Sequence, residues 1–231
     1  PFLEKSRKGV FFVIGRYQLS RKETMMKIYQ PTRKLRLANI ILASTIIIGG
    51  CAGVGGRAFI RATDDTLSLG RTTENEIRQR MGSPYEEGVI MSNGKEVKTI
   101  TYSYANTAGE ALSTGIIPAR CQGFSFFEGK LVGYNFTSSW KEDHTNFDDI
   151  KVYNIKKGIT TRNEVEQLLG RAGGKCTYPI TTNNDEEGFS YLYSQTKGFA
   201  SNLKIYQKSL VVTFNREGIV TNVVYSELGE K

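Results

Sequence analysis

The chain has 231 residues, which is enough for one large domain or two small ones. Its formal net charge of +8 invites a nucleic-acid partner, but the charge is unevenly distributed. Residues 1–50 hold ten of the 31 Lys and Arg residues and two of the 23 Asp and Glu residues, so 21 basic and 21 acidic residues follow. This neutral remainder has no basic stripe that could follow a phosphate backbone, which argues against nucleic acid as a partner.

Residues 26–50 have the order of a targeting signal, a basic n-region before an apolar h-region. The h-region, Leu37–Ile48, is about a dozen residues long, whereas a membrane span needs roughly 20. Ile48-Gly49-Gly50-Cys51 follows and resembles the lipobox of bacterial lipoproteins, which implies that Cys51 is the lipid attachment site. A short membrane anchor with a chance cysteine is the alternative. The basic residues of the n-region are Lys27, Arg33, Lys34 and Arg36.

The residues on either side of this signal complete the predicted organisation. Ala52, not Asp, follows Cys51, which by resemblance to enterobacterial sorting favours the outer membrane, with the protein on its periplasmic face. The glycines within 51–65 indicate a flexible tether. Residues 1–25 do not fit the scheme, because an n-region rarely lies so far from the start, and we interpret them as a gene-model extension.

An internal repeat at a spacing of 88 residues is the most informative pattern in the remainder. Residues 70–82, GRTTENEIRQRMG, recur as residues 158–170, GITTRNEVEQLLG. Each copy predicts a short helix that begins with a capping box, in which a Thr hydroxyl and a Glu carboxylate three residues later satisfy each other's backbone amides. Each copy then has an apolar pair four residues apart and ends at a glycine that suits the left-handed C′ position.

Alternating apolar residues after each helix predict antiparallel strands. The predicted fold class is therefore α+β: two tandem repeats, 66–139 and 150–227, each a short helix packed on its own small antiparallel sheet. In the first repeat, Ala105–Ala119 interrupts the pattern as an insertion. The expected strands lie in 98–104, 124–127, 131–136, 189–193, 209–215 and 219–225.

These motifs resemble the SmpA/OmlA (BamE-like) outer-membrane lipoprotein domain. The resemblance rests on Gly-x-Thr-Thr-x-x-Glu in 70–76, the following Gly82-Ser83-Pro84, and the terminal hairpin 213–222. The tandem arrangement is similar to the β-lactamase inhibitor protein, and the resemblance covers roughly 66–227. It implies a non-catalytic domain that binds other envelope proteins, with no cofactor and no metal. The alternative is an inhibitor of a periplasmic or extracellular enzyme, and the acidic tip 184–187 is then the candidate segment that enters the active site of that enzyme.

No catalytic or metal-binding constellation is evident in the sequence. His144 is the single histidine and lies in a polar connector, so we interpret it as a solvated loop residue. The acidic pairs and triplets at 148–149 and 185–187 lack the spacing of a calcium loop. Cys121 and Cys176 lie in different repeats and form either a disulfide between them or two buried thiols.

Aromatic residues supply the candidate interaction surface. Most of the Phe and Tyr residues at alternating strand positions are expected in the core. Phe124, Phe126 and Phe127, which follow the insertion, are the candidate patch for a protein partner. The pattern does not predict the oligomeric state or the partner's identity.

Overall fold

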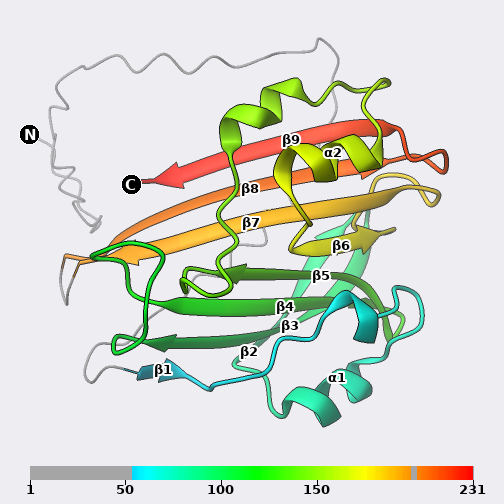
Figure 1. Ribbon diagram of the computed structural model, residues 1–231. Helices are drawn as coiled ribbons and strands as arrows, with labels where there is room; N and C mark the ends of the chain where they lie inside the picture. Colours follow the sequence, from blue (N-terminus) through cyan, green and yellow to red (C-terminus); the bar gives the residue numbers. More distant parts are fainter. Residues whose placement is uncertain (1–53, 199–201, 231) are drawn as a thin grey trace, which may run out of the picture. The chain divides into compact units, whose positions relative to one another are not determined.

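A computed structural model of the chain describes residues 54–198 and 202–230 (Figure 1). Within them the chain alternates short helical segments with long strands. The helices are η1 (Asp64–Thr66), α1 (Glu74–Met81), η2 (Asp149–Asn154) and α2 (Arg162–Leu169). The strands are β1 (Val54–Gly56), β2 (Glu86–Ser92), β3 (Lys95–Asn106), β4 (Ala119–Phe127), β5 (Lys130–Ser138), β6 (Gly174–Thr177), β7 (Glu187–Lys197), β8 (Lys204–Phe214) and β9 (Val220–Gly229). None of the helices in these residues has the length and apolar character needed to cross a membrane.

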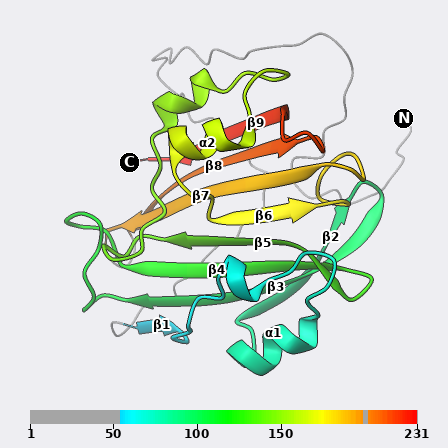
Figure 2. The same ribbon diagram turned by 45° about the vertical axis from the view of Figure 1, so that its right-hand side comes forward.

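All nine strands form one antiparallel sheet in the order β1-β3-β4-β5-β6-β7-β8-β9, and β2 also pairs with β3 (Figures 1 and 2). The prediction of an α+β fold with two separate small sheets is therefore wrong: the structure is 47% strand and 14% helix. The cause is a strand that the sequence analysis missed. The four-residue β6 pairs with β7 of its own repeat and with β5 of the first repeat, through Gly133↔Cys176 and Tyr134↔Lys175, and so joins the two expected sheets.

One face of the sheet, here called the helix face, carries both helices (Figure 2). Ile77 of α1 is 1% exposed and packs in a core with Ile100 and Phe124. Val165 of α2 is fully buried in a second core with Leu210. Helices of eight residues are marginal in isolation, so their burial against the strands is what stabilises them.

The predicted capping boxes are confirmed in both helices. Thr73 N donates to Glu76 Oε2 at 2.7 Å and Glu76 N donates to Thr73 Oγ1 at 3.3 Å. Thr161 and Glu164 repeat both bonds at 2.7 and 3.3 Å. Each helix also ends at the predicted glycine. The expected left-handed helical conformation is wrong, because Gly82 and Gly170 combine φ of +80° with ψ of −155° and −175°.

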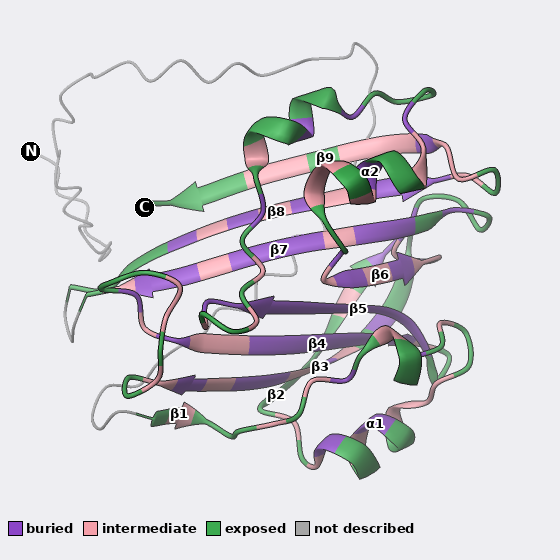
Figure 3. Ribbon diagram, viewed as in Figure 1, coloured by how far each residue is buried: buried purple, intermediate pink, exposed green. Residues whose placement is uncertain are grey.

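The two copies also share bonds that the sequence did not predict; their glycines are 88 residues apart and their tyrosines 89. Tyr102 Oη donates to Gly82 O at 2.9 Å, and Tyr191 Oη donates to Gly170 O at the same distance. A β-bulge precedes Phe126 in β4, and another precedes Phe214 in β8. The two halves therefore keep equivalent local geometry although their strands belong to a single sheet, whose most buried part is the middle (Figure 3).

Part of the segment expected to be a flexible tether is attached to the sheet. Residues 54–56 form β1 and pair with β3, with Val54 opposite Asn106. Residues 57–69, here called the arm, then cross the helix face between α1 and α2 (Figure 2). The attachment follows from backbone hydrogen bonding, because Arg57 N continues the pairing by donating to Ser103 O at 3.0 Å.

Three further hydrogen bonds lie away from the β5–β6 pair: two join the two repeats, and the third joins the connector between them to β7. Asn93 at the tip of the β2–β3 hairpin donates to Thr181 O at 2.6 Å. Ile117 N in the insertion donates to Thr196 O at 2.8 Å. The hydroxyl of Thr145 donates to Leu192 O at 2.6 Å. The insertion is thus held against the second half.

Candidate functional site

The aromatic patch expected from the sequence is not on the surface. Phe124 and Phe126 are 1% and 2% exposed and belong to the core under α1. Their positions in β4 direct them to the helix face, because they pair opposite Ile100 and Lys98 of β3. Phe127 is half-buried at the end of the strand. The predicted patch is therefore wrong for Phe124 and Phe126, whose alternation reflects packing.

Cys121 and Cys176 are both buried and no disulfide joins them. The register explains why. Cys121 pairs with Thr137 of β5, whereas Cys176 pairs with Gly133, four residues further along the same strand. At about 3.3 Å per residue this separation is roughly 13 Å along the strand, well beyond the reach of a disulfide. The alternative of two buried thiols fits this structure, and burial raises the pKa of Cys176 to about 12.

The side chains of the acidic clusters make hydrogen bonds and ion pairs within the fold. Asp148 caps η2 by accepting from Ile150 N at 3.1 Å, and Asp149 pairs with Lys208 at 2.8 Å. At the 184–187 tip, Glu186 is buried and accepts from Asn183 N at 3.1 Å.

Cys51 lies outside the described residues, so the structure does not describe the predicted lipid attachment site.

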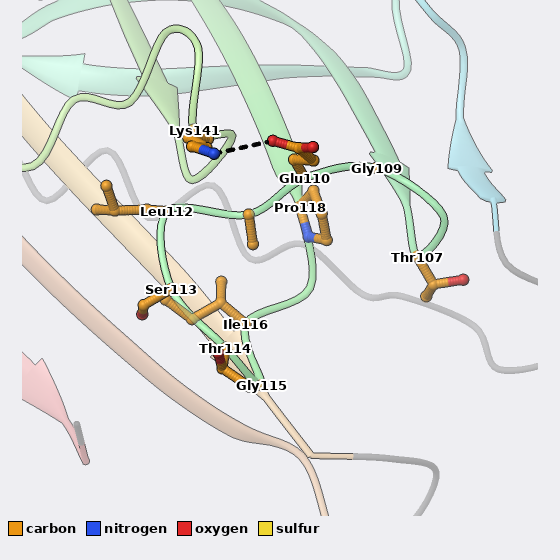
Figure 4. A pocket seen from close by; sticks show the side chains of 11 residues that line it. Thr107, Gly109, Glu110, Leu112, Ser113, Thr114, Gly115, Ile116, Pro118 and Lys141 are labelled. Atoms are coloured by element: carbon orange, nitrogen blue, oxygen red, sulfur yellow. Dashed lines mark hydrogen bonds and ion pairs between the residues drawn. The ribbon is translucent and has the colours of Figure 1, made fainter.

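An open hollow of about 460 Å³ lies along the insertion (Figure 4). Its walls come from residues 107–118 of this loop together with Lys141. Lys141 Nζ pairs with Glu110 Oε2 at 3.2 Å, and their side chains are 69% and 80% exposed. A salt bridge this open to solvent contributes little to stability or recognition, so we do not place the functional site here.

A more organised arrangement lies where the arm crosses the sheet. Gln122 of β4 is fully buried and points to the helix face. Its side-chain oxygen accepts from Ala62 N at 2.9 Å, and its amide donates to Ala62 O at 2.7 Å. One side chain thus replaces a backbone pairing partner and fixes the arm between α1 and α2.

Asp64 links the arm to strands of both halves. Its Oδ1 accepts from Tyr134 Oη of β5 at 2.9 Å, and its Oδ2 lies 3.0 Å from Lys175 of β6 and 3.4 Å from Arg171. Burial opposes the ionisation of Asp64, but the bonds from Lys175 and Tyr134 and the charges of Lys175 and Arg171 outweigh it and hold the pKa of Asp64 below its usual range. The carboxylate is therefore ionised at neutral pH.

Beside this bridge is a cavity of about 220 Å³, here called the junction pocket. It draws on both halves: the arm supplies Arg61, and residues 169–173 after α2 supply the opposite wall. Arg61 Cζ lies 4.1 Å from the centre of the Phe136 ring, and its Nε is buried without a hydrogen-bond partner. Burial lowers the pKa of Arg61, although nearby carboxylates oppose the shift. His144, expected as a solvated loop residue, is exposed at the rim.

Sequence reasoning missed this site because its residues carry no local signal. Arg61 lies in the segment expected to be a tether, and Phe136 and Tyr191 have the pattern of core strands. A buried Nε without a hydrogen-bond partner is common to Arg61, Arg120 and Arg162. Arg61 differs from the other two because, among the described residues, it has no ion pair, whereas Arg120 pairs with Glu142 and Arg162 pairs with Glu187.

Comparison with known proteins finds a similarity in the second half. Residues 145–223 match the family model described as the outer membrane protein assembly factor BamE domain. The second repeat is thus similar to domains of this family. No curated protein is significantly similar to the chain. A β-lactamase inhibitor-like protein from Streptococcus mutans is similar at 11% identity over 67% of this chain and 82% of that chain, with a TM-score of 0.34, which is too low to support any argument.

Proposed function

We propose that this chain is a non-enzymatic bacterial envelope protein that binds other proteins in outer-membrane assembly or maintenance. The observation that carries the proposal is the match of residues 145–223 to a domain of an outer-membrane assembly factor. The first half takes the same role, because it shares the repeat and the equivalent tyrosine and glycine bonds at residues 82, 102, 170 and 191.

The proposed anchor is a lipid on Cys51, after removal of residues 26–50. The support is the sequence alone: an n-region, an h-region and two glycines before a cysteine. Only two residues separate Cys51 from Val54, the first residue of β1. An outer-membrane lipid would therefore hold the β1 end of the sheet close to the periplasmic membrane surface.

The surface proposed for the partner is the helix face at the junction of the two halves. It is concave where the junction pocket lies, and it combines charged groups with buried aromatic walls, as protein-binding sites do. The alternative of an enzyme inhibitor is not favoured, because Glu186 and Glu187 at the acidic tip are engaged within the fold by Asn183 N and Arg162.

Affinity capture from crosslinked membranes tests the proposal. The full chain, carrying a C-terminal tag, should recover outer-membrane assembly proteins in preference to soluble periplasmic enzymes. A variant with paired changes at the junction, Arg171→Glu and Lys175→Glu, should lose this capture, and a distant control, Lys204→Glu, should retain it. Capture of a soluble enzyme, or equal capture by all three proteins, would contradict the proposal.

A further inference from the structure

Most of the charged groups around the junction pocket lie in ion pairs. Asp64 is paired with Lys175 and Arg171. Asp143, which lines the pocket, is paired with Arg120 at 3.3 Å. Arg61 has no ion pair and no side-chain hydrogen bond with any residue in 54–198 or 202–230, so the carboxylates of Asp64 and Asp143 act on its charge without direct contact.

The geometry of Arg61 favours a planar anion. Its guanidinium lies over the buried ring of Phe136, and such stacking leaves the in-plane N–H groups uncovered. Because Nε is buried, the two terminal Nη groups form the edge that a ligand in the pocket can reach. A carboxylate matches this edge with two parallel hydrogen bonds. The buried Phe147 and Tyr191 also line the pocket and reduce its water content, which strengthens a charged hydrogen bond.

The remaining lining disfavours a doubly charged ligand. Asp143 contributes a negative charge, and Gly170 lies at the carbonyl end of α2, where the helix dipole is negative. A single cation without a direct ion pair matches a monoanion better than a phosphate dianion in these surroundings. The cavity of about 220 Å³ accommodates a carboxylate with the short stem of an acidic side chain.

We propose that the junction pocket binds a carboxylate through Arg61, and that its ligand is an acidic side chain of the protein partner. The identity of the ligand as part of a protein rests on the proposed function. The binding of a carboxylate does not depend on the proposed function, because it is argued from Arg61 and the pocket alone. The pocket requires both halves of the chain, since Arg61 and Phe136 precede residue 145 and the opposite wall follows it.

The test is an NMR titration of the full chain in detergent, observing the arginine Nε–Hε groups. The probes are N-acetyl-glutamate N-methylamide and inorganic phosphate. The carboxylate should shift the Arg61 signal saturably and bind more tightly than phosphate. Arg61→Lys keeps the charge but lacks the planar edge, and we expect its affinity, measured by calorimetry, to fall about tenfold or more. Arg71→Lys, at an exposed arginine, should bind as the unchanged protein does.

Tighter phosphate binding, no saturable shift, or equal affinity in Arg61→Lys would overturn the carboxylate site. Partner capture separates this result from the proposed function. If the carboxylate binds but no envelope protein is captured, the ligand is not a partner side chain and that part of the inference fails. If proteins are captured equally by Arg61→Lys and the unchanged chain, the inference fails while the proposed function stands.

Discussion

Replacing Gln122 by Leu should release the arm from the sheet. Gln122 is fully buried, and its amide satisfies both the N–H and the C=O of Ala62, which is itself 3% exposed. Leu has a similar volume but offers neither bond, so two buried backbone groups lose their partners. Each such group costs about 1–3 kcal/mol, and the gain from burying Leu offsets part of the sum. We expect the free energy of unfolding to fall by about 2–4 kcal/mol.

The assay combines urea denaturation with limited trypsin digestion at Arg57 and Arg61. The first measures the loss of stability, and the second measures whether the arm has detached, because the arm can recover hydrogen bonds to water only by leaving the sheet. Gln79→Leu is the matched control, since Gln79 is exposed on α1, and we expect its effect to stay within about 0.5 kcal/mol. Equal stability and equal trypsin resistance of the two variants would refute the reasoning.

Three further predictions follow from the sequence and the described contacts. Thr161→Ala should lower the free energy of unfolding by about 1 kcal/mol through loss of the helix cap, and Thr161→Ser should restore most of it. The pKa of Asp64 is lower in the folded than in the unfolded protein, so its carboxylate stabilises the fold above the unfolded pKa of about 3.9, and this contribution disappears as the pH falls through the folded pKa. The difference in unfolding free energy between Asp64→Asn and the unchanged protein, measured by urea denaturation, should therefore shrink below about pH 4. A difference that stays constant with pH would contradict this prediction. Cys51→Ser should abolish labelling by a fatty-acid analogue, and undiminished labelling would exclude Cys51 as the anchor.

The sequence predicted the repeated local units well because their signals are local. A capping box needs residues only three apart, and each helix was found with its N-cap and its terminal glycine. The six expected strands are present and longer than predicted. Apolar alternation marks only part of each strand, and the missed parts include buried polar residues such as Gln122, Gln195 and Thr196. Asn93-Gly94, with φ of 50° and 72°, was a recognisable hairpin turn that would have predicted β2.

The joining of the sheets was not predictable from the same signals. β6 has four residues, GKCT, without apolar alternation, and its pairing with β5 is set by contacts between segments about 40 residues apart. Gly174 shows the constraint: a Cβ there would lie 2.1 Å from Tyr134 O, so the close approach of the two strands depends on glycine. A glycine in a predicted loop carries no sign of this role until its neighbour is known.

The same junction shows that neither repeat alone contains the proposed binding site. A single repeat supplies one helix and one strand edge. The junction pocket needs more than this, because Arg61 precedes the first repeat and residues 169–173 belong to the second. Pairing of β6 with β5 places residues 169–173 opposite the arm, and the bonds of Asp64 to Tyr134 and Lys175 fix their separation. Arg61 is then held at a boundary that exists only in the tandem chain. The proposed binding surface therefore lies between the two copies, and the residues that differ between them, not those that repeat, would determine its chemistry.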